Sequence, residues 1–206
     1  MTQLKKDLLV GLILGFLSSI FLIFIIQNPQ IEEFRQFAVP DRALWFLPLI
    51  MATLFGAGIA IAFLLGKIVR VVYQFTKFGT VGVLNTLIDF GILNLLIWIT
   101  GITGGLAIVP LNALSFFAAT TNSYFWNKFW VFSKKTAPRP KEFLQFVIIS
   151  TVGIGINTGI VYAGTTFAAP LFDLSSGAWV NAVKLAATFA AMFWNFLGYK
   201  LVVFKK

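Results

Sequence analysis

Six long runs of apolar residues constrain this chain more than any other feature of its sequence. A helix needs about 20 apolar residues to cross the hydrocarbon core, because lipid cannot satisfy an open backbone group. Of the 206 side chains, 59% are apolar, and the 16 Lys or Arg and 7 Asp or Glu stand in short clusters. We therefore predict an all-α, polytopic integral membrane protein. Its six predicted spans are residues 8–26, 44–65, 78–99, 106–127, 143–167 and 178–203.

The positive charges gather on one side of these spans and predict their orientation. With a cytosolic N-terminus, 13 Lys and Arg fall on the inner side, and only Arg35 and Arg42 fall outside. Lys and Arg in short loops are retained in the cytosol. We therefore predict a multi-pass protein of the cytoplasmic membrane with both termini and the 134–141 loop cytosolic, and with Gln36 and Asp173 outside. This topology explains the net charge of +9 better than nucleic-acid binding, which needs basic residues on one solvated face.

The first apolar run has a second interpretation as a secretory signal peptide, because Lys5 and Lys6 precede it. Its length of about 19 residues favours a membrane anchor. No small-x-small cleavage site precedes the polar 27–30 segment, so we expect the run to stay in the mature protein.

The chain contains neither histidine nor cysteine, which excludes disulfides, thiolate nucleophiles, imidazole bases and zinc sites. Asp89 is the only acid within the predicted spans, and a lone carboxylate is a poor catalytic set. We therefore predict no enzymatic activity, no cofactor and no metal. An ion channel is a further alternative, but the sequence contains no ring of charges or carbonyl filter motif.

Residues 1–73 are predicted to form an N-terminal transmembrane hairpin followed by an amphipathic cytosolic linker. From this linker into the following residues, Lys67, Arg70, Gln74 and Lys77 recur at helical spacing opposite apolar residues. That pattern is typical of a helix lying on the inner leaflet. A frayed cytosolic end of the second span is an equal alternative.

The remaining residues, 74–206, contain an internal repeat, with copies at 74–135 and 143–206. Asn85-Thr86 recurs as Asn157-Thr158, and residues 127–132 recur as 199–204, each at an offset of 72. Because each copy holds two spans, both enter the membrane from the same side. They are predicted to be parallel repeats related by an axis along the membrane normal, with a substrate pocket between them.

Three motifs in these copies resemble the GtrA-like family over roughly residues 74–206. They are Phe78-Gly79-x-x-Gly82-x-x-Asn85-Thr86-x-x-x-Asp89, Asn127-Lys128-x-Trp130-Val131-Phe132 and Asn195-Phe196-x-x-x-Lys200-x-x-x-Phe204. The extra N-terminal hairpin lies outside the family pattern. The second copy also departs from the first, with Tyr199 in place of Asn127 and Val161 in place of Asp89.

The resemblance implies a small polytopic protein that flips a polyprenyl-phosphate-linked monosaccharide across the membrane for glycosylation of cell-surface polysaccharides. Its implied partners are this lipid-linked sugar, membrane lipids and a polyprenyl-phosphate glycosyltransferase. The alternative is a non-transporting subunit that recruits or orients the glycosyltransferase.

A flippase of this kind needs cations for the phosphate and hydrogen-bonding groups for the sugar. Lys128 and Lys200 each lie near the end of an apolar run, and several amides lie at membrane depth. The competing interpretation is that the lysines snorkel to headgroups and the amides bridge helices. The candidate substrate-binding residues are Asn85, Asp89, Asn127, Lys128, Trp130, Asn157, Lys184, Asn195 and Lys200.

Asp89 and Lys184 are the two charges that the predicted spans place deepest in the membrane. A charge at mid-helix costs about 2.5–3.5 kcal/mol on insertion scales, so each is expected to have a partner. Counting about 1.5 Å per residue leaves about 5 Å of height between them. We predict that they form an ion pair, either a permanent packing bridge or one opened by substrate.

Overall fold

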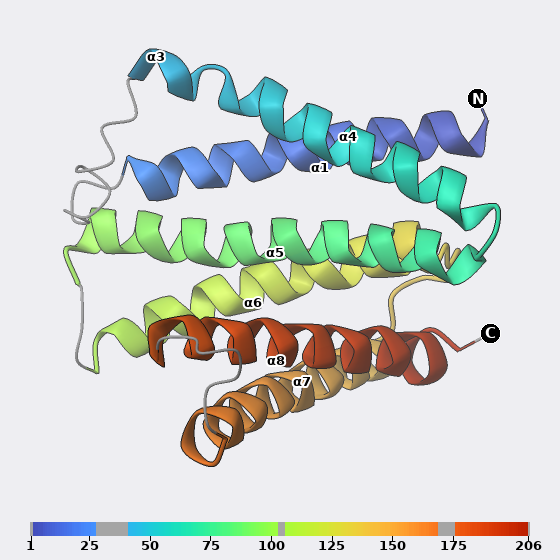
Figure 1. Ribbon diagram of the computed structural model, residues 1–206. Helices are drawn as coiled ribbons and strands as arrows, with labels where there is room; N and C mark the ends of the chain where they lie inside the picture. The colour runs from blue at the N-terminus through green and yellow to red at the C-terminus, as the bar shows by residue number, and fades with distance from the viewer. Residues whose placement is uncertain (1, 28–40, 103–105, 169–175, 206) are drawn as a thin grey trace. The chain divides into compact units, whose positions relative to one another are not determined.

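The computed structural model describes residues 2–27, 41–102, 106–168 and 176–205, and in these ranges every regular element is a helix (Figure 1). Six long helices coincide with the six predicted spans, which confirms the predicted all-α polytopic fold. They are α1 (Gln3–Ile26), α4 (Leu47–Gly66), α5 (Arg70–Thr100), α6 (Ile108–Trp126), α7 (Pro140–Thr166) and α8 (Ser176–Gly198), with the short α3 (Asp41–Leu44) before α4.

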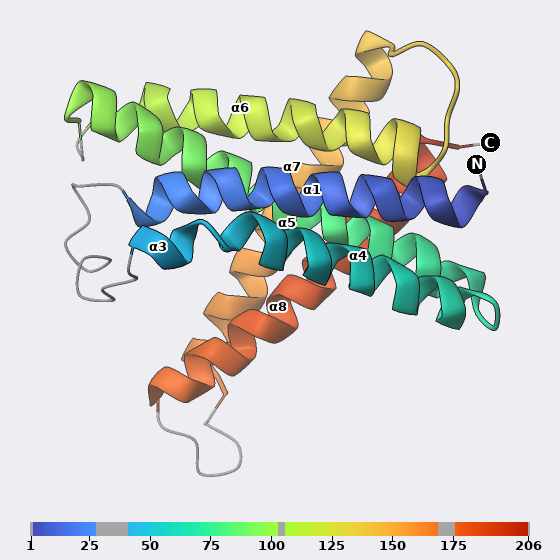
Figure 2. The same ribbon diagram turned by 90° about the horizontal axis from the view of Figure 1, so that it is seen from above.

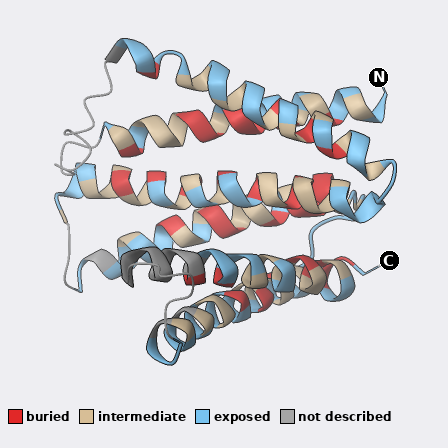
Figure 3. Ribbon diagram, viewed as in Figure 1, coloured by how far each residue is buried: buried red, intermediate tan, exposed pale blue. Residues whose placement is uncertain are grey.

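Among the described helices, α1, α4, α5, α7 and α8 contain segments long and apolar enough to cross a membrane. The α6 helix is not among them, and its second half carries a run of hydroxyl and amide side chains, Thr120 to Ser123. Large apolar side chains such as Leu54 and Ile61 of α4 are exposed, as expected for a surface that faces lipid. Figure 3 shows that exposed and intermediate residues predominate along α4, whereas buried residues recur along α1 and α5. The chain is therefore a multi-pass membrane protein.

The chain divides into two compact units, Met1–Ser133 and Lys134–Lys206. In the first, α1 packs against both α4 and α5, and α5 packs against α6 (Figures 1 and 2). In the second, α7 and α8 pack against each other as a helical hairpin. The N-terminal hairpin thus lies directly against the first helix of the repeat region.

The predicted amphipathic linker is continuous with α5. Val69 is extended at the N-cap, and α5 starts at Arg70 and continues to Thr100. Lys77, which was placed on a solvated face, is buried, while Val72 on the opposite side is exposed. Residues 70–77 therefore form the first two turns of a long helix. That helix ends at Gly101, whose φ of 70° is a left-handed conformation that glycine adopts at little cost.

Both repeat copies end in a π-helix at the same place. The segment η1 (Asn127–Val131) follows α6, and η2 (Tyr199–Val203) follows α8, 72 residues later. The last bond of each runs from a backbone N–H to the carbonyl five residues earlier, over 2.8 Å from Phe132 to Asn127 and 2.7 Å from Phe204 to Tyr199. Short π-helical segments are rare and occur frequently at functional sites. The two copies therefore share local backbone structure as well as sequence.

The contact between α1 and α4 depends on small residues. A Cβ atom built on Gly15 would lie 2.7 Å from Ala52 Cα and even closer to the carbonyl oxygen of Met51. Helices in lipid associate closely where glycine, alanine or serine removes the side chain from the interface. Gly15 therefore fixes how closely α1 and α4 can approach.

We expect Gly15→Ala to destabilise the protein by about 1–3 kcal/mol, because backbone atoms rather than a flexible side chain must move. Gly58→Ala on α4 is the matched control, since a Cβ there meets nothing within 4 Å. Thermal unfolding of the two variants in detergent should separate them by several degrees. Equal midpoints would contradict this account of the α1–α4 contact.

Candidate functional site

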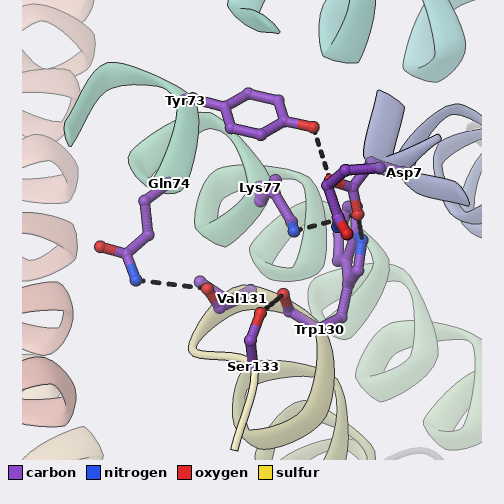
Figure 4. Close-up of polar contacts among 8 residues, drawn as sticks. Asp7, Tyr73, Gln74, Lys77, Trp130, Val131 and Ser133 are labelled. Carbon is purple, nitrogen blue, oxygen red and sulfur yellow. Dashed lines mark hydrogen bonds and ion pairs between the residues drawn. The ribbon is translucent and has the colours of Figure 1, made fainter. Parts of the chain in front are cut away.

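A buried polar cluster around Asp7 joins α1, α5 and η1, and its polar contacts are drawn in Figure 4. The Oδ1 atom of Asp7 accepts hydrogen bonds from Lys77 Nζ at 3.1 Å and Trp130 Nε1 at 2.7 Å. Its Oδ2 atom accepts from the Tyr73 hydroxyl at 2.6 Å and from Gln3 Nε2 at 3.0 Å. One carboxylate thus accepts four hydrogen bonds, two at each oxygen.

Charge and aromatic rings both stabilise this cluster. Asp7 is 1% exposed and Lys77 is 4% exposed, so the ion pair between them is almost entirely removed from solvent. The Lys77 ammonium also lies 4.8 Å from the Trp130 ring centroid and 5.5 Å from that of Tyr73. A buried ion pair repays its desolvation only when its remaining hydrogen-bonding capacity is satisfied. The four donors to Asp7 and the two rings around Lys77 meet that condition.

Local helical geometry accounts for how these side chains meet. Tyr73 and Lys77 are four residues apart on α5, and Gln3 and Asp7 are four residues apart on α1, so each pair shares one face. Trp130 comes from η1, which is tied to α5 by the hydrogen bond from Gln74 Nε2 to the Val131 carbonyl at 3.2 Å. The π-helix therefore supplies the third side of the cluster.

The predicted residues Asn127, Lys128 and Trp130 are brought together on η1. Lys128 is fully buried, and its Nζ donates to the Tyr124 hydroxyl at 3.4 Å. Asn127 Nδ2 donates to the Ser123 carbonyl at 2.8 Å, while its buried Oδ1 has no hydrogen-bond partner among the described residues. Trp130 donates its indole N–H to Asp7, so it already has a protein partner. Contact of these residues with a lipid-linked phosphate stays a prediction.

Asp89 and Asn85 lie one turn apart on α5, farther along the helix. Asp89 Oδ1 accepts a hydrogen bond from the Ser115 hydroxyl of α6 at 2.7 Å. The Oδ1 atom of Asn85 is buried and has no hydrogen-bond partner in the described part of the chain. The side chain of Lys184 lies outside the described residues, so the predicted Asp89–Lys184 ion pair stays a prediction.

The predicted residues of the second unit are held less tightly. Asn157 Nδ2 lies 3.4 Å from the Thr188 hydroxyl, across the α7–α8 hairpin. Lys200 is partly exposed, with its ammonium 5.4 Å from the Phe196 ring centroid. At the position that matches Asn127, Tyr199 is buried against Phe146, with ring centroids 4.1 Å apart. The two copies therefore differ chemically although both end in a π-helix.

Asn195 lies against Gly153 in the α7–α8 hairpin. A Cβ at Gly153 would lie 2.9 Å from both Cγ and Nδ2 of Asn195, and the buried Oδ1 of Asn195 has no hydrogen-bond partner among the residues described.

We expect Gly153→Ala to displace this amide and to reduce any transport that depends on it by about tenfold or more, because a small misplacement can cost that much. Gly155→Ala is the control, because a Cβ there meets nothing within 4 Å. Transport assays on both variants, normalised to folded protein, measure the difference, and equal rates would contradict a role for Asn195.

Asp7, Tyr73 and Lys77 were not among the residues predicted from sequence. Asp7 and Lys77 each stand immediately before a predicted span, at Leu8 and Phe78, so Lys77 was counted among the cytosolic cations and Asp7 was given no role. The structure extends both helices past these charges. An acid before one span and a lysine before another could have indicated a pair at the same depth. Within the described residues, no three His, Cys, Asp or Glu side chains gather as metal ligands.

Comparison with known proteins connects this arrangement to a family. The family described as "GtrA/DPMS, transmembrane domain" matches residues 77–204, which is more than half of the chain. An "Uncharacterized membrane protein YngA" of Bacillus subtilis (strain 168) is 36% identical over 128 residues, covering 62% of this chain and 77% of the relative. No solved structure matches this chain. Lys77 and Trp130 lie within the matched region, and Asp7 lies outside it. The chain belongs to the GtrA/DPMS transmembrane-domain family, whose members are membrane proteins related to lipid-linked sugars.

Proposed function

We propose that this chain moves a polyprenyl-phosphate-linked monosaccharide across the cytoplasmic membrane for glycosylation of cell-surface polysaccharides, without catalysing a reaction itself. The observation that carries this proposal is the fully buried Lys128, which lies on η1 beside the Oδ1 of Asn127, unsatisfied among the described residues, in the region shared with the family. A buried ammonium needs an anion or a set of acceptors, and a phosphodiester supplies both.

The unpartnered amide oxygens in the described residues support the sugar-binding part of this proposal. Asn85, Asn127 and Asn195 each bury an Oδ1 atom without a hydrogen-bond partner, at three different places along the helices. A buried acceptor that lacks a partner costs about 1–3 kcal/mol, and sugar hydroxyls are donors that could satisfy it. The site residues of this proposal are Asn85, Asp89, Asn127, Lys128, Trp130, Asn157, Lys184, Asn195 and Lys200.

Reconstitution tests the proposal directly. Purified protein in vesicles should move a labelled polyprenyl-phosphate monosaccharide between leaflets, measured as label that becomes accessible to an external reagent. Empty vesicles and vesicles with the Lys128→Phe, Phe129→Lys variant are the controls. Movement only when a polyprenyl-phosphate glycosyltransferase is also present would instead support a partner subunit that recruits or orients that enzyme.

The proposed orientation places both termini and the 134–141 loop in the cytosol. The chain has no cysteine, so single cysteines at positions 36, 136 and 173 can be labelled without background. Positions 36 and 173 lie outside the described residues, and position 136 is exposed near the start of the second unit. We expect an impermeant thiol reagent to label cysteines 36 and 173 in intact cells and to leave cysteine 136 unlabelled until the cells are permeabilised. The reverse pattern would reject this orientation.

A further inference from the structure

The donors that surround Asp7 form a cradle that suits a phosphate group as well as a carboxylate. Lys77, Tyr73 and Trp130 direct an ammonium, a hydroxyl and an indole N–H toward the same carboxylate (Figure 4). These three donors come from α5 and η1, whereas the carboxylate comes from α1. The cradle is therefore built by one part of the chain and filled by another.

The acceptor belongs to the hairpin that lies outside the family match. Lys77 and Trp130 fall inside residues 77–204, Tyr73 lies one turn before Lys77 on α5, and Asp7 lies in α1. Charge-assisted hydrogen bonds of this kind are the strong contacts of carboxylate and phosphate recognition alike. An oxygen of a phosphate can accept each of the bonds that Lys77, Tyr73 and Trp130 now give to Asp7.

The cradle also lies at a depth that a lipid headgroup can reach. Lys77 is seven residues into α5, or about 10 Å along the helix axis from Arg70, and Asp7 is four residues into α1. The exposed cations Lys5, Lys6 and Arg70 surround the same helix ends. An anion that approaches this end of the first unit therefore meets positive charge before it reaches Lys77.

We propose that Lys77, Tyr73 and Trp130 form a binding site for the phosphate group of a phospholipid-like ligand, and that the carboxylate of Asp7 occupies this site in competition with it. Asp7 then acts as a built-in inhibitor that a phosphate must displace. When only a fraction of the protein molecules has the site free of Asp7, the apparent affinity for the ligand falls in proportion to that fraction. The identity of the lipid rests on the proposed function, but the phosphate site and its competition with Asp7 do not.

Binding of farnesyl phosphate to the full chain in an uncharged detergent tests the proposal. Farnesol controls for the lipid chain, and inorganic phosphate separates a free anion from a lipid headgroup. We expect Asp7→Asn to bind farnesyl phosphate about tenfold more tightly than the wild type, measured by thermal shift, because the competitor is removed. The Asp7→Asn, Lys77→Met double variant should lose this gain. Glu142→Gln, which makes the same change in charge in the second unit, should match the wild type.

Each outcome decides the question. If Asp7→Asn does not fold alone, the proposal requires farnesyl phosphate, and not farnesol, to restore a folded species during extraction, because the phosphate replaces the missing anion. Failure of that rescue, equal affinity of Asp7→Asn and wild type, or undiminished binding by the double variant would overturn the proposal. Equal potency of inorganic phosphate would reject a lipid as the source of the group. Tight binding without movement of lipid in vesicles would reject the proposed transport and leave the phosphate site standing.

Discussion

Replacement of Lys77 by methionine is expected to lower the free energy of unfolding by about 3–5 kcal/mol, because it leaves the Asp7 carboxylate buried without its counter-charge. Both side chains are almost fully buried, so water cannot replace the lost ammonium. Chemical or thermal unfolding in detergent, followed by helical circular dichroism, measures this loss.

Two further variants make the experiment specific. Lys67→Met removes an exposed lysine at the C-cap of α4. Among the interactions described, the Lys67 ammonium contacts only the Phe63 ring, so this variant should lower the free energy of unfolding by less than about 1 kcal/mol. The Asp7→Asn, Lys77→Met double variant removes both charges and should recover most of the stability that Lys77→Met loses. A Lys77→Met variant as stable as Lys67→Met would show that the buried pair contributes little.

The exchange of Lys128 with its neighbour is expected to abolish transport, with a loss of about 100-fold or more. In the Lys128→Phe, Phe129→Lys variant the ammonium moves from a fully buried position to one that is 47% exposed, on a different face of η1. Composition and net charge stay the same, and the exposed lysine can still snorkel to headgroups. Only an interaction that requires the original register is lost.

Phe129→Ala controls for the loss of the exposed ring, and it should retain transport. Both variants should be extracted as folded protein, which is judged by monodisperse elution in detergent. Transport by the exchange variant at the wild-type rate would favour snorkelling as the reason for a lysine at this position.

The sequence predicted the number and location of the long helices well because apolar length and charge clustering are local properties. The motif that opens at Phe78 and the repeat at an offset of 72 likewise located the family region. The offset also predicted which segments of the two copies would share a backbone structure, because η1 starts at Asn127 and η2 starts 72 residues later at Tyr199. The π-helical form of these turns was not anticipated, because it arises from backbone bonds that carry no simple residue pattern.

The Asp7 cluster could not be predicted in the same way. Its members are far apart in sequence, and hydropathy treats a charge at the edge of an apolar run as a solvated flank. Burial of Lys77 depends on α1 packing against α5, which is a tertiary property. Residues 67–77 show the same limit, since their amphipathic spacing did not reveal that Lys77 turns inward toward a carboxylate.

The sequence separation within the Asp7 cluster has a consequence for how the protein is made. Lys77 follows Asp7 by 70 residues, and Trp130 follows it by 123. At about 5–20 residues per second, the ribosome reaches Lys77 some 4–14 seconds after Asp7 has been synthesised, and Trp130 some 6–25 seconds after it. During that interval Asp7 lacks the Lys77 ammonium and the Trp130 indole N–H that it contacts in the folded protein, and a carboxylate held in lipid without them is costly. The start of α1 must therefore remain in the aqueous interface at first, and it can reach its buried position only after α5 and η1 have been synthesised.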